Sequence, residues 1–224
     1  MKYFLLFLLL IGFTSPKAQE NIRYINITGT SELILPADQM NFTVQIKNIN
    51  NSIEESKKAN DDHLSQLLSL LKNSGINSND ITTSPITLGK NYEFHDREKI
   101  QKGFYTEVIV TFLLKDLSKY YDITNKLSSS SSFDNISSSY AIADYELQNK
   151  LAYQKALKTA KEKAEYMANT LGLKLGDALE IDASTPVQNY PNPFNNATII
   201  DSPNSNVSGK VTISRSVRVK FALD

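Results

Sequence analysis

The sequence predicts an α+β fold in which β-hairpins alternate with three helices and a mixed or antiparallel sheet packs against those helices. Two observations support this prediction. Several segments alternate apolar and polar residues with the period of a strand, and three others carry apolar residues with the 3.6-residue period of a helix. Pairs of strand segments occur between the helices, which favours this class over a doubly wound parallel sheet.

The first strand segment covers Arg23–Thr30, and Glu32–Leu35 continues it in an extended form. Pro36-Ala37-Asp38 is typical of a turn, and Met40–Ile46 then resumes the alternation with its apolar residues on one face. We therefore expect two strands joined at this turn.

The first helix should begin at Ser52, because Ser52 and Glu55 have the spacing of a capping box. The helix should end at Asn73-Ser74-Gly75, since glycine is favoured just after a helix. Between these limits a stripe of leucines follows the helical period: Leu64, Leu67, Leu68 and Leu71.

The middle of the chain predicts a hairpin followed by a helix and a strand. Asp80–Tyr92 and Phe104–Leu114 are the expected strands, joined by the polar link Glu93–Gly103. A second helix is expected from Asp116, with its apolar residues directed to the core, and the serine run Ser128–Ser132 should end it. Phe133–Tyr145 is interpreted as the next strand.

The strongest pattern is an alanine at every fourth position of the segment Asp144–Leu171, which predicts the third helix. Such a stripe winds slowly around a helix and permits close approach to a sheet or another helix. The alanines are Ala152, Ala156, Ala160, Ala164 and Ala168. A strand-like segment, a loop rich in Pro and Asn, and a terminal strand follow, at residues 178–183, 186–208 and 210–223.

The N-terminus has the layout of a secretory signal peptide covering residues 1–18. Lys2 precedes the apolar run Tyr3–Phe13, and small or polar residues lead to a cleavage point after Ala18. The apolar run is too short for a stable membrane span, since a helix needs about 20 apolar residues to cross a bilayer. We expect an exported protein that is periplasmic or associated with the outer envelope.

Composition excludes several classes of site. The chain contains no Cys, which rules out disulfides, thiolate metal ligands and a cysteine nucleophile. Its 24 basic residues balance 24 acidic ones, so there is no basic excess that would favour nucleic-acid binding. Loss of Lys2 and Lys17 with the leader makes the exported chain mildly acidic.

Motifs that carry catalysis or cofactor binding are missing from the sequence. The two histidines, His63 and His95, lack the spacing of a zinc-binding motif, and His95-Asp96-Glu98 is interpreted as an exposed charge cluster. The chain has neither a nucleophile elbow nor a glycine-rich phosphate-binding motif. We therefore assign no catalytic, cofactor-binding or metal-binding residues, expect no cofactor, and predict that the protein is not an enzyme.

Four segments together resemble the SIMPL-domain family. They are ITGTSELILPADQMNFTVQI from Ile27, LLKNSGINSNDITTSPITLGKNY from Leu70, GFYTEVIVTFLLKDLSKYYDITNKL from Gly103 and ALKTAKEKAEYMANTLGLKLGDALEI from Ala156. The chain departs from the family pattern at Ser31, where the second glycine is usual, at Ala37, which separates the Pro from the Asp, and at Phe104, where Tyr is usual. The resemblance spans residues 22–224.

The resemblance implies an exported, often oligomeric α+β envelope protein without a shared set of catalytic residues. We expect residues 19–224 to form a SIMPL-like domain, either as one compact unit or as two ββα-type halves. The expected function is self-assembly or binding of an envelope protein partner. The alternative is an enzyme or small-ligand binder whose site lies in the 93–103 and 186–208 loops.

One local motif permits a second interpretation. The segment YPNPFN, beginning at Tyr190, resembles the start of a C-terminal sorting domain used in bacterial secretion. That domain is longer than the remainder of this chain, so we interpret the segment as part of a loop.

Overall fold

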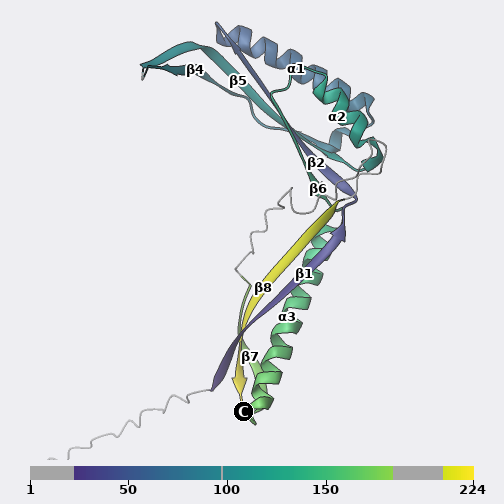
Figure 1. Ribbon diagram of the computed structural model, residues 1–224, viewed down its shortest axis with the longest axis vertical. Helices are drawn as coiled ribbons and strands as arrows, with labels where there is room; N and C mark the ends of the chain where they lie inside the picture. Colours follow the sequence, from purple (N-terminus) through teal and green to yellow (C-terminus); the bar gives the residue numbers. More distant parts are fainter. Residues whose placement is uncertain (1–22, 97, 184–208) are drawn as a thin grey trace, which may run out of the picture.

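The computed structural model describes residues 23–96, 98–183 and 209–224. These residues form two antiparallel sheets packed against three α-helices, so the predicted α+β class is confirmed. The two sheets lie end to end and give the protein an elongated, bent shape (Figure 1). The predicted signal peptide and the whole 186–208 loop, with its YPNPFN segment, lie outside the described residues.

The elements follow one another along the chain in this order: β1 (Tyr24–Pro36), β2 (Gln39–Asn50), α1 (Ile53–Asn73), η1 (Ser78–Asp80), β3 (Ile81–Thr83), β4 (Thr87–His95), β5 (Glu98–Leu114), η2 (Leu117–Lys119), α2 (Tyr120–Ser128), β6 (Asn135–Ala141), α3 (Tyr145–Thr170), β7 (Leu175–Asp182) and β8 (Lys210–Leu223). We call β1, β7, β8 and α3 the α3 lobe. All the other elements form the α1 lobe.

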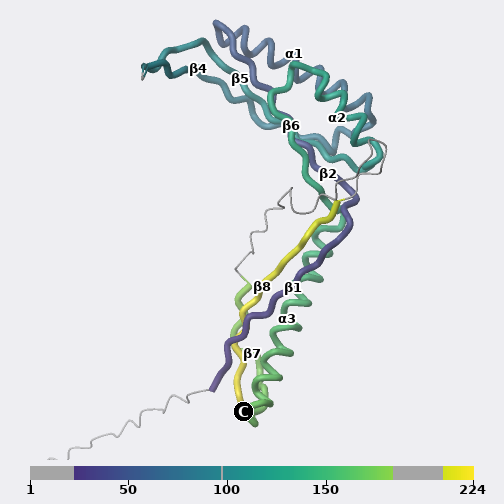
Figure 2. The backbone as a smooth tube through the Cα atoms, in the orientation of Figure 1, coloured from purple at the N-terminus to yellow at the C-terminus, as the bar shows by residue number. Residues whose placement is uncertain are grey.

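The α3 lobe is built on a sheet with the strand order β1-β8-β7. β1 and β8 pair antiparallel along their whole length, from Tyr24 opposite Ala222 to Pro36 opposite Lys210. α3 runs along one face of this sheet, against β1 and β8, as the tube in Figure 2 shows. The first and last strands of the described chain are therefore neighbours.

The predicted alanine stripe forms the contact between α3 and its sheet. All five alanines are buried, and Gly29 of β1 lies against two of them, Ala156 and Ala160, with no room for a Cβ atom. Two positions along, the Ser31 hydroxyl donates a hydrogen bond of 2.7 Å to the Ala152 carbonyl. The departure from the family pattern at Ser31 thus adds a buried hydrogen bond to this packing.

The α1 lobe contains a sheet with the order β3-β5-β2-β6, in which β4 also pairs with β5. Its main core lies between this sheet and the helices, and the rings of Phe42 and Phe112 stack there with centroids 4.8 Å apart. The other fully buried large side chains of this core are Ile46, Leu67, Leu71, Leu114, Ile123, Leu127, Val44 and Val110.

The predicted ends of α1 are confirmed. The Ser52 hydroxyl oxygen accepts a hydrogen bond of 3.2 Å from the Glu55 backbone N–H, as a helix N-cap should. At the other end Gly75 has φ +80°, and the Ile76 N–H donates to the Leu71 carbonyl. This left-handed residue satisfies carbonyls of the last turn and ends the helix.

A buried polar cluster fixes α1 to the sheet. The Asn60 amide donates to the carbonyls of Ile46 and Thr106, at 3.0 and 3.2 Å. The Ser56 hydroxyl donates to the Asn48 carbonyl at 2.6 Å, and the Thr106 hydroxyl donates to the Ser56 carbonyl at 2.8 Å. These directional bonds set the position of the helix along the strands more narrowly than apolar contacts alone.

The middle of the chain differs from the sequence prediction in three places. The expected strand Asp80–Tyr92 is two strands, β3 and β4, because Pro85 has no N–H to donate and Ser84 accepts from Ile109 through its side chain. The expected strand Phe133–Tyr145 is shorter, at Asn135–Ala141. The helix expected from Asp116 begins with the turn η2, and Tyr121 on α2 is partly exposed.

β1 and β2, which follow each other along the chain, do not pair with each other but belong to different sheets. Instead, residues 37–38 carry the chain from one lobe to the other. The Asp38 carboxylate accepts from the Ala143 N–H at 2.9 Å, and the Ala37 N–H donates to the Gly209 carbonyl at 2.9 Å.

The ring of Tyr140 lies so close to Gly209 that a Cβ there would clash with it. Burial, with the neighbouring Tyr120 and Tyr121, raises the pKa of Tyr140.

None of the described helices combines the length with the apolar character that crossing a bilayer requires.

Candidate functional site

The most exposed apolar surface of the α1 lobe is the far part of the hairpin formed by β4 and β5. We call residues 92–96 and 98–102 the arm. The arm extends beyond the helices of its lobe (Figure 1). Phe94, near its tip, is 76% exposed, and Tyr92, Leu88 and Ile100 on the same hairpin are also exposed. Exposed aromatic and aliphatic residues on a projecting element are typical of binding surfaces.

The arm begins where β2 ends. Phe104 is the last residue of β5 that pairs with β2, opposite Asn50. The next residue outward, Gly103, has φ +108°, and a Cβ there would lie 2.4 Å from the Asn50 carbonyl oxygen. Only glycine fits this position. The sequence therefore specifies a hairpin that leaves the sheet at Gly103 and continues as two strands.

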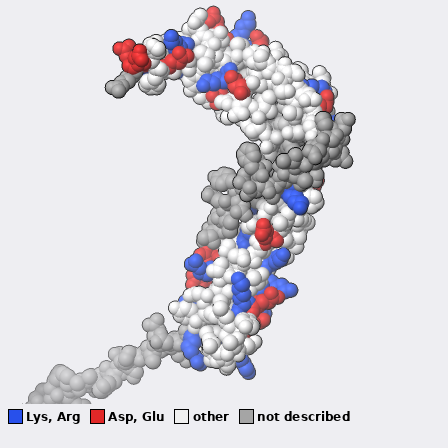
Figure 3. Space-filling view, in the orientation of Figure 1, with Lys and Arg blue, Asp and Glu red and all other residues white. Residues whose placement is uncertain are grey.

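Side chains on the arm alternate between its two faces. Tyr92 and Phe94 share one face with Lys99, whose Nζ lies 4.0 Å from the centroid of the Tyr92 ring. Asp96 in the turn has φ +51°, a left-handed conformation that aspartate tolerates better than most residues. In the space-filling view acidic residues lie at the tip, and residues of both signs lie behind it (Figure 3). The arm thus combines two aromatic rings with a charged border.

The prediction that residues 93–103 form a loop is wrong, because strands β4 and β5 occupy most of this range. The second loop of the alternative ligand site, 186–208, lies outside the described residues. His95 Nε2 lies 3.6 Å from the Asp96 carboxylate at the exposed tip, while His63 lies on α1. In the described part of the chain no three His, Asp or Glu side chains group so as to hold a metal ion.

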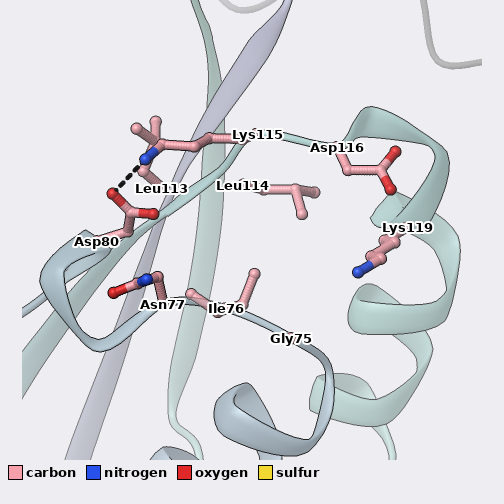
Figure 4. Close-up of a pocket in the computed structure, with 9 residues that line it drawn as sticks. All are labelled: Gly75, Ile76, Asn77, Asp80, Leu113, Leu114, Lys115, Asp116 and Lys119. Carbon is pink, nitrogen blue, oxygen red and sulfur yellow. Dashed lines mark hydrogen bonds and ion pairs between the residues drawn. The ribbon is translucent and has the colours of Figure 1, made fainter.

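A pocket of about 270 Å³ lies between the end of α1, the end of β5 and the start of α2 (Figure 4). Its charged side chains already have partners in the chain. Lys115 Nζ lies 2.7 Å from the Asp80 carboxylate, and Lys119 donates to the Ser74 carbonyl at 3.4 Å. Hydrogen bonds from the side chain and then the backbone N–H of Ser118 lower the pKa of Asp116. The charged side chains of this pocket therefore stabilise the local fold around the end of α1 and the start of α2.

A wider groove of about 690 Å³ lies between α3 and β7. Leu179 lines it, and Ile181 further along β7 is also exposed. β7 pairs with β8 through two irregularities in register, between Leu175 and Ala178 and between Ala178 and Glu180. Bulges of this kind protect an outer strand from pairing with another chain. The outer edge of β7 is for this reason a poor template for an added strand.

The fold and its surface define an elongated, two-sheet α+β protein whose most prominent exposed element is an arm that carries exposed aromatic rings among charged residues. Comparison with known families also identifies the family. The model of the SIMPL family, described as a protein of unknown function (DUF541), matches residues 25–221. The chain belongs to the SIMPL family, as its four motif segments predicted. No curated protein matches it.

Proposed function

We propose that this SIMPL-family protein is an exported component of the bacterial cell envelope that acts by association, either with copies of itself or with an envelope protein partner, and not by catalysis. The arm is the observation that carries the proposal. Two-stranded hairpins are marginally stable alone in water, and Phe94, which is 76% exposed, buries little of its ring in one chain. A second surface that covers the arm would supply the missing apolar contact.

Other features support the same proposal. The N-terminal leader favours export, and the sequence lacks the motifs that carry nucleophilic, metal or phosphate chemistry. The charged groups of the pocket in Figure 4 serve the local fold. The alternative, a small-ligand or enzymatic site in the 93–103 and 186–208 segments, has less support because the first segment forms the arm strands.

The test is the mass in solution of the exported chain beginning at Gln19, measured by size-exclusion chromatography with light scattering. We expect a particle larger than one chain, or a partner recovered by cross-linking in the native envelope. The Tyr92→Ser, Phe94→Ser double variant should lose the contacts that the arm makes, seen as a smaller particle than the wild type or as loss of the cross-linked partner, and keep its circular dichroism spectrum. The control is Tyr166→Ser on α3, because Tyr166 is comparably exposed at 73% but lies in the other lobe.

A wild-type chain that stays monomeric at high concentration and yields no cross-linked partner in the envelope would overturn the proposal. Cell fractionation tests the location: we expect the mature protein in the periplasm or with the outer envelope. N-terminal sequencing should place its start at Gln19.

A further inference from the structure

β1 presents a long, regular and open strand edge. Among the strands that the structure describes, β1 pairs only with β8. The register between them is unbroken from Tyr24 to Pro36, in contrast to the irregular pairing of β7. Straight outer strands of this length are templates for pairing with another chain unless something covers them.

The direction of the backbone shows which residues form this edge. The Leu223 N–H donates to the Arg23 carbonyl, and the Ala37 N–H donates to the Gly209 carbonyl, both at 2.9 Å. Odd-numbered residues of β1 therefore direct their backbone groups to β8, and even-numbered residues direct theirs away from it. The Thr28 carbonyl accepts a hydrogen bond of 3.3 Å from Lys163 Nζ of α3, which agrees with this assignment. Lys163 therefore covers the edge at Thr28 and must share or release this carbonyl when another strand pairs there.

The outward residues of β1 form a self-complementary series around Gly29. When a second β1 lies antiparallel with Gly29 opposite Gly29, Thr28 faces Thr30, Asn26 faces Glu32 and Tyr24 faces Ile34. Thr–Thr and aromatic–β-branched pairs are favourable cross-strand neighbours. Tyr24 and Ile34 are 52% and 58% exposed in one chain and would cover each other.

We propose that two copies of this chain join their β1 edges about a two-fold axis at Gly29, so that the two three-stranded sheets become one six-stranded sheet. The proposal rests on the proposed function and specifies its partner as a second copy. It uses a surface distinct from the arm, which stays available for further contacts. A two-fold contact requires a surface that is complementary to itself, and β1 meets that requirement.

α3 carries a second self-complementary series at the same level. The residues that precede the stripe alanines lie on the side of α3 that faces the open edge, as the contact of Lys163 with Thr28 shows. Gly29 lies against Ala156 and Ala160, so an axis at Gly29 passes close to Thr159. Around Thr159 an antiparallel helix pair brings together residues that are exposed in one chain: Leu151 with Met167, and Leu147 with Leu171.

The spacing suits a helix pair. α3 packs over β1 and β8, and its alanines Ala156 and Ala160 lie directly against Gly29 of β1. Two such helices on a continuous sheet therefore lie less than two strand spacings apart, at most about 10 Å. Packed helices have axes about 8–10 Å apart. One two-fold axis therefore serves both series: it passes through Gly29 at the centre of the β1 series and close to Thr159 at the centre of the α3 series.

The same geometry places Lys155 opposite Lys163 of the partner subunit, on both sides of Thr159. Like charges at this spacing weaken pairing, and salt screens them. Dimerisation should therefore strengthen as salt concentration rises. Lys163→Glu should also strengthen it by creating two Lys–Glu pairs, whereas Lys155→Glu with Lys163→Glu should restore the repulsion.

The first experiment uses the absence of cysteine in the natural chain. In the exported chain, Thr159→Cys places one thiol near the axis, and mild oxidation should convert most of it to a covalent dimer. Tyr166→Cys on the same helix, 73% exposed, is the matched control and should cross-link much less. Equal cross-linking of the two variants would overturn the proposal.

The second experiment is Thr30→Pro, which removes an outward N–H and leaves the bonds to β8 in place. We expect the dimer dissociation constant to rise about tenfold or more, while Thr30→Val stays close to the wild type. If Thr30→Pro fails to fold, Lys163→Glu still tests the proposal, because its expected effect is tighter association and misfolding would not produce that.

The outcomes separate this inference from the proposed function. An assembly that survives Thr30→Pro, ignores Lys163→Glu and shows no selective Thr159→Cys cross-link would overturn the β1 pairing and leave the proposed function standing. A chain that stays monomeric in every variant and has no envelope partner would overturn both.

Discussion

Gly29 of β1 and Ala156 of α3 approach so closely that a Cβ atom on the glycine would lie 2.1 Å from the alanine carbonyl oxygen. The same atom would lie 2.6 Å from the Ala160 backbone nitrogen. Because both obstacles are helix backbone, no change of rotamer can relieve the overlap. The space between β1 and α3 at this position therefore cannot hold even one additional methyl group.

Gly29→Ala should accordingly destabilise the protein by about 3 kcal/mol, since α3 must shift away from the sheet. The measurement is the midpoint of urea unfolding. The control is Asp177→Ala, an exposed position in β7 of the same lobe, which should change the midpoint little. Equal midpoints for Gly29→Ala and the wild type would show that the helix tolerates a wider separation.

Asn60→Leu should cost about 2–4 kcal/mol, because it removes two hydrogen bonds and leaves buried carbonyls of Ile46 and Thr106 facing an apolar group. Urea unfolding measures the loss. Lys58→Leu places the same side chain on an exposed position of α1 and should be nearly neutral. If the two variants unfold alike, the buried polar cluster contributes nothing beyond packing.

Ser52→Ala should destabilise the protein by about 1 kcal/mol through loss of the N-cap bond to the Glu55 N–H. Ser52→Asp keeps a capping oxygen and should retain most of the wild-type stability. Hydrogen exchange of the first turn of α1 gives a local readout, with faster exchange expected only in Ser52→Ala. Unchanged exchange in that variant would contradict a capping role.

Ser118→Ala should raise the pKa of Asp116 toward its ordinary value, because hydrogen bonds from Ser118 lower it. A carboxyl with a lowered folded-state pKa adds stability above the ordinary pKa and loses it as pH falls through the lowered value. The wild type should therefore exceed Ser118→Ala in stability at neutral pH by more than in acid. NMR titration of Asp116 measures the shift directly.

Ser65→Ala is the control for this pH effect, since the Ser65 hydroxyl donates its hydrogen bond to the backbone carbonyl of Asp61. Its stability difference from the wild type should not depend on pH. An Asp116 titration that is the same with and without Ser118 would contradict the assignment.

Local patterns were sufficient to predict the helices and the character of their buried faces. The alanine stripe of α3 and the capping serine of α1 are signals contained within a few residues, and both have the structural role expected of them. The break at Pro85 also has a local cause, although alternation on either side of it suggested one strand.

Long-range features could not be predicted in this way. The pairing of β1 with β8 joins segments at opposite ends of the chain, and nothing in the alternation of either strand specifies its neighbour. The arm was missed because residues 93–103 are polar and exposed, so the strand there buries no face that would produce a pattern. Gly103 was the available signal, as a glycine inside a strand marks a bend or a close backbone approach.

The adjacency of β1 and β8 also determines the order in which the chain can complete its fold. Every strand of the α1 lobe finds its partners within residues 39–141, so that lobe can form while the rest of the chain is still being synthesised. β1 emerges first but must wait for the last strand before its sheet can close. Until then its edge and the alanine face of α3 are uncovered, and this interval is when the chain is most exposed to aggregation and to proteases.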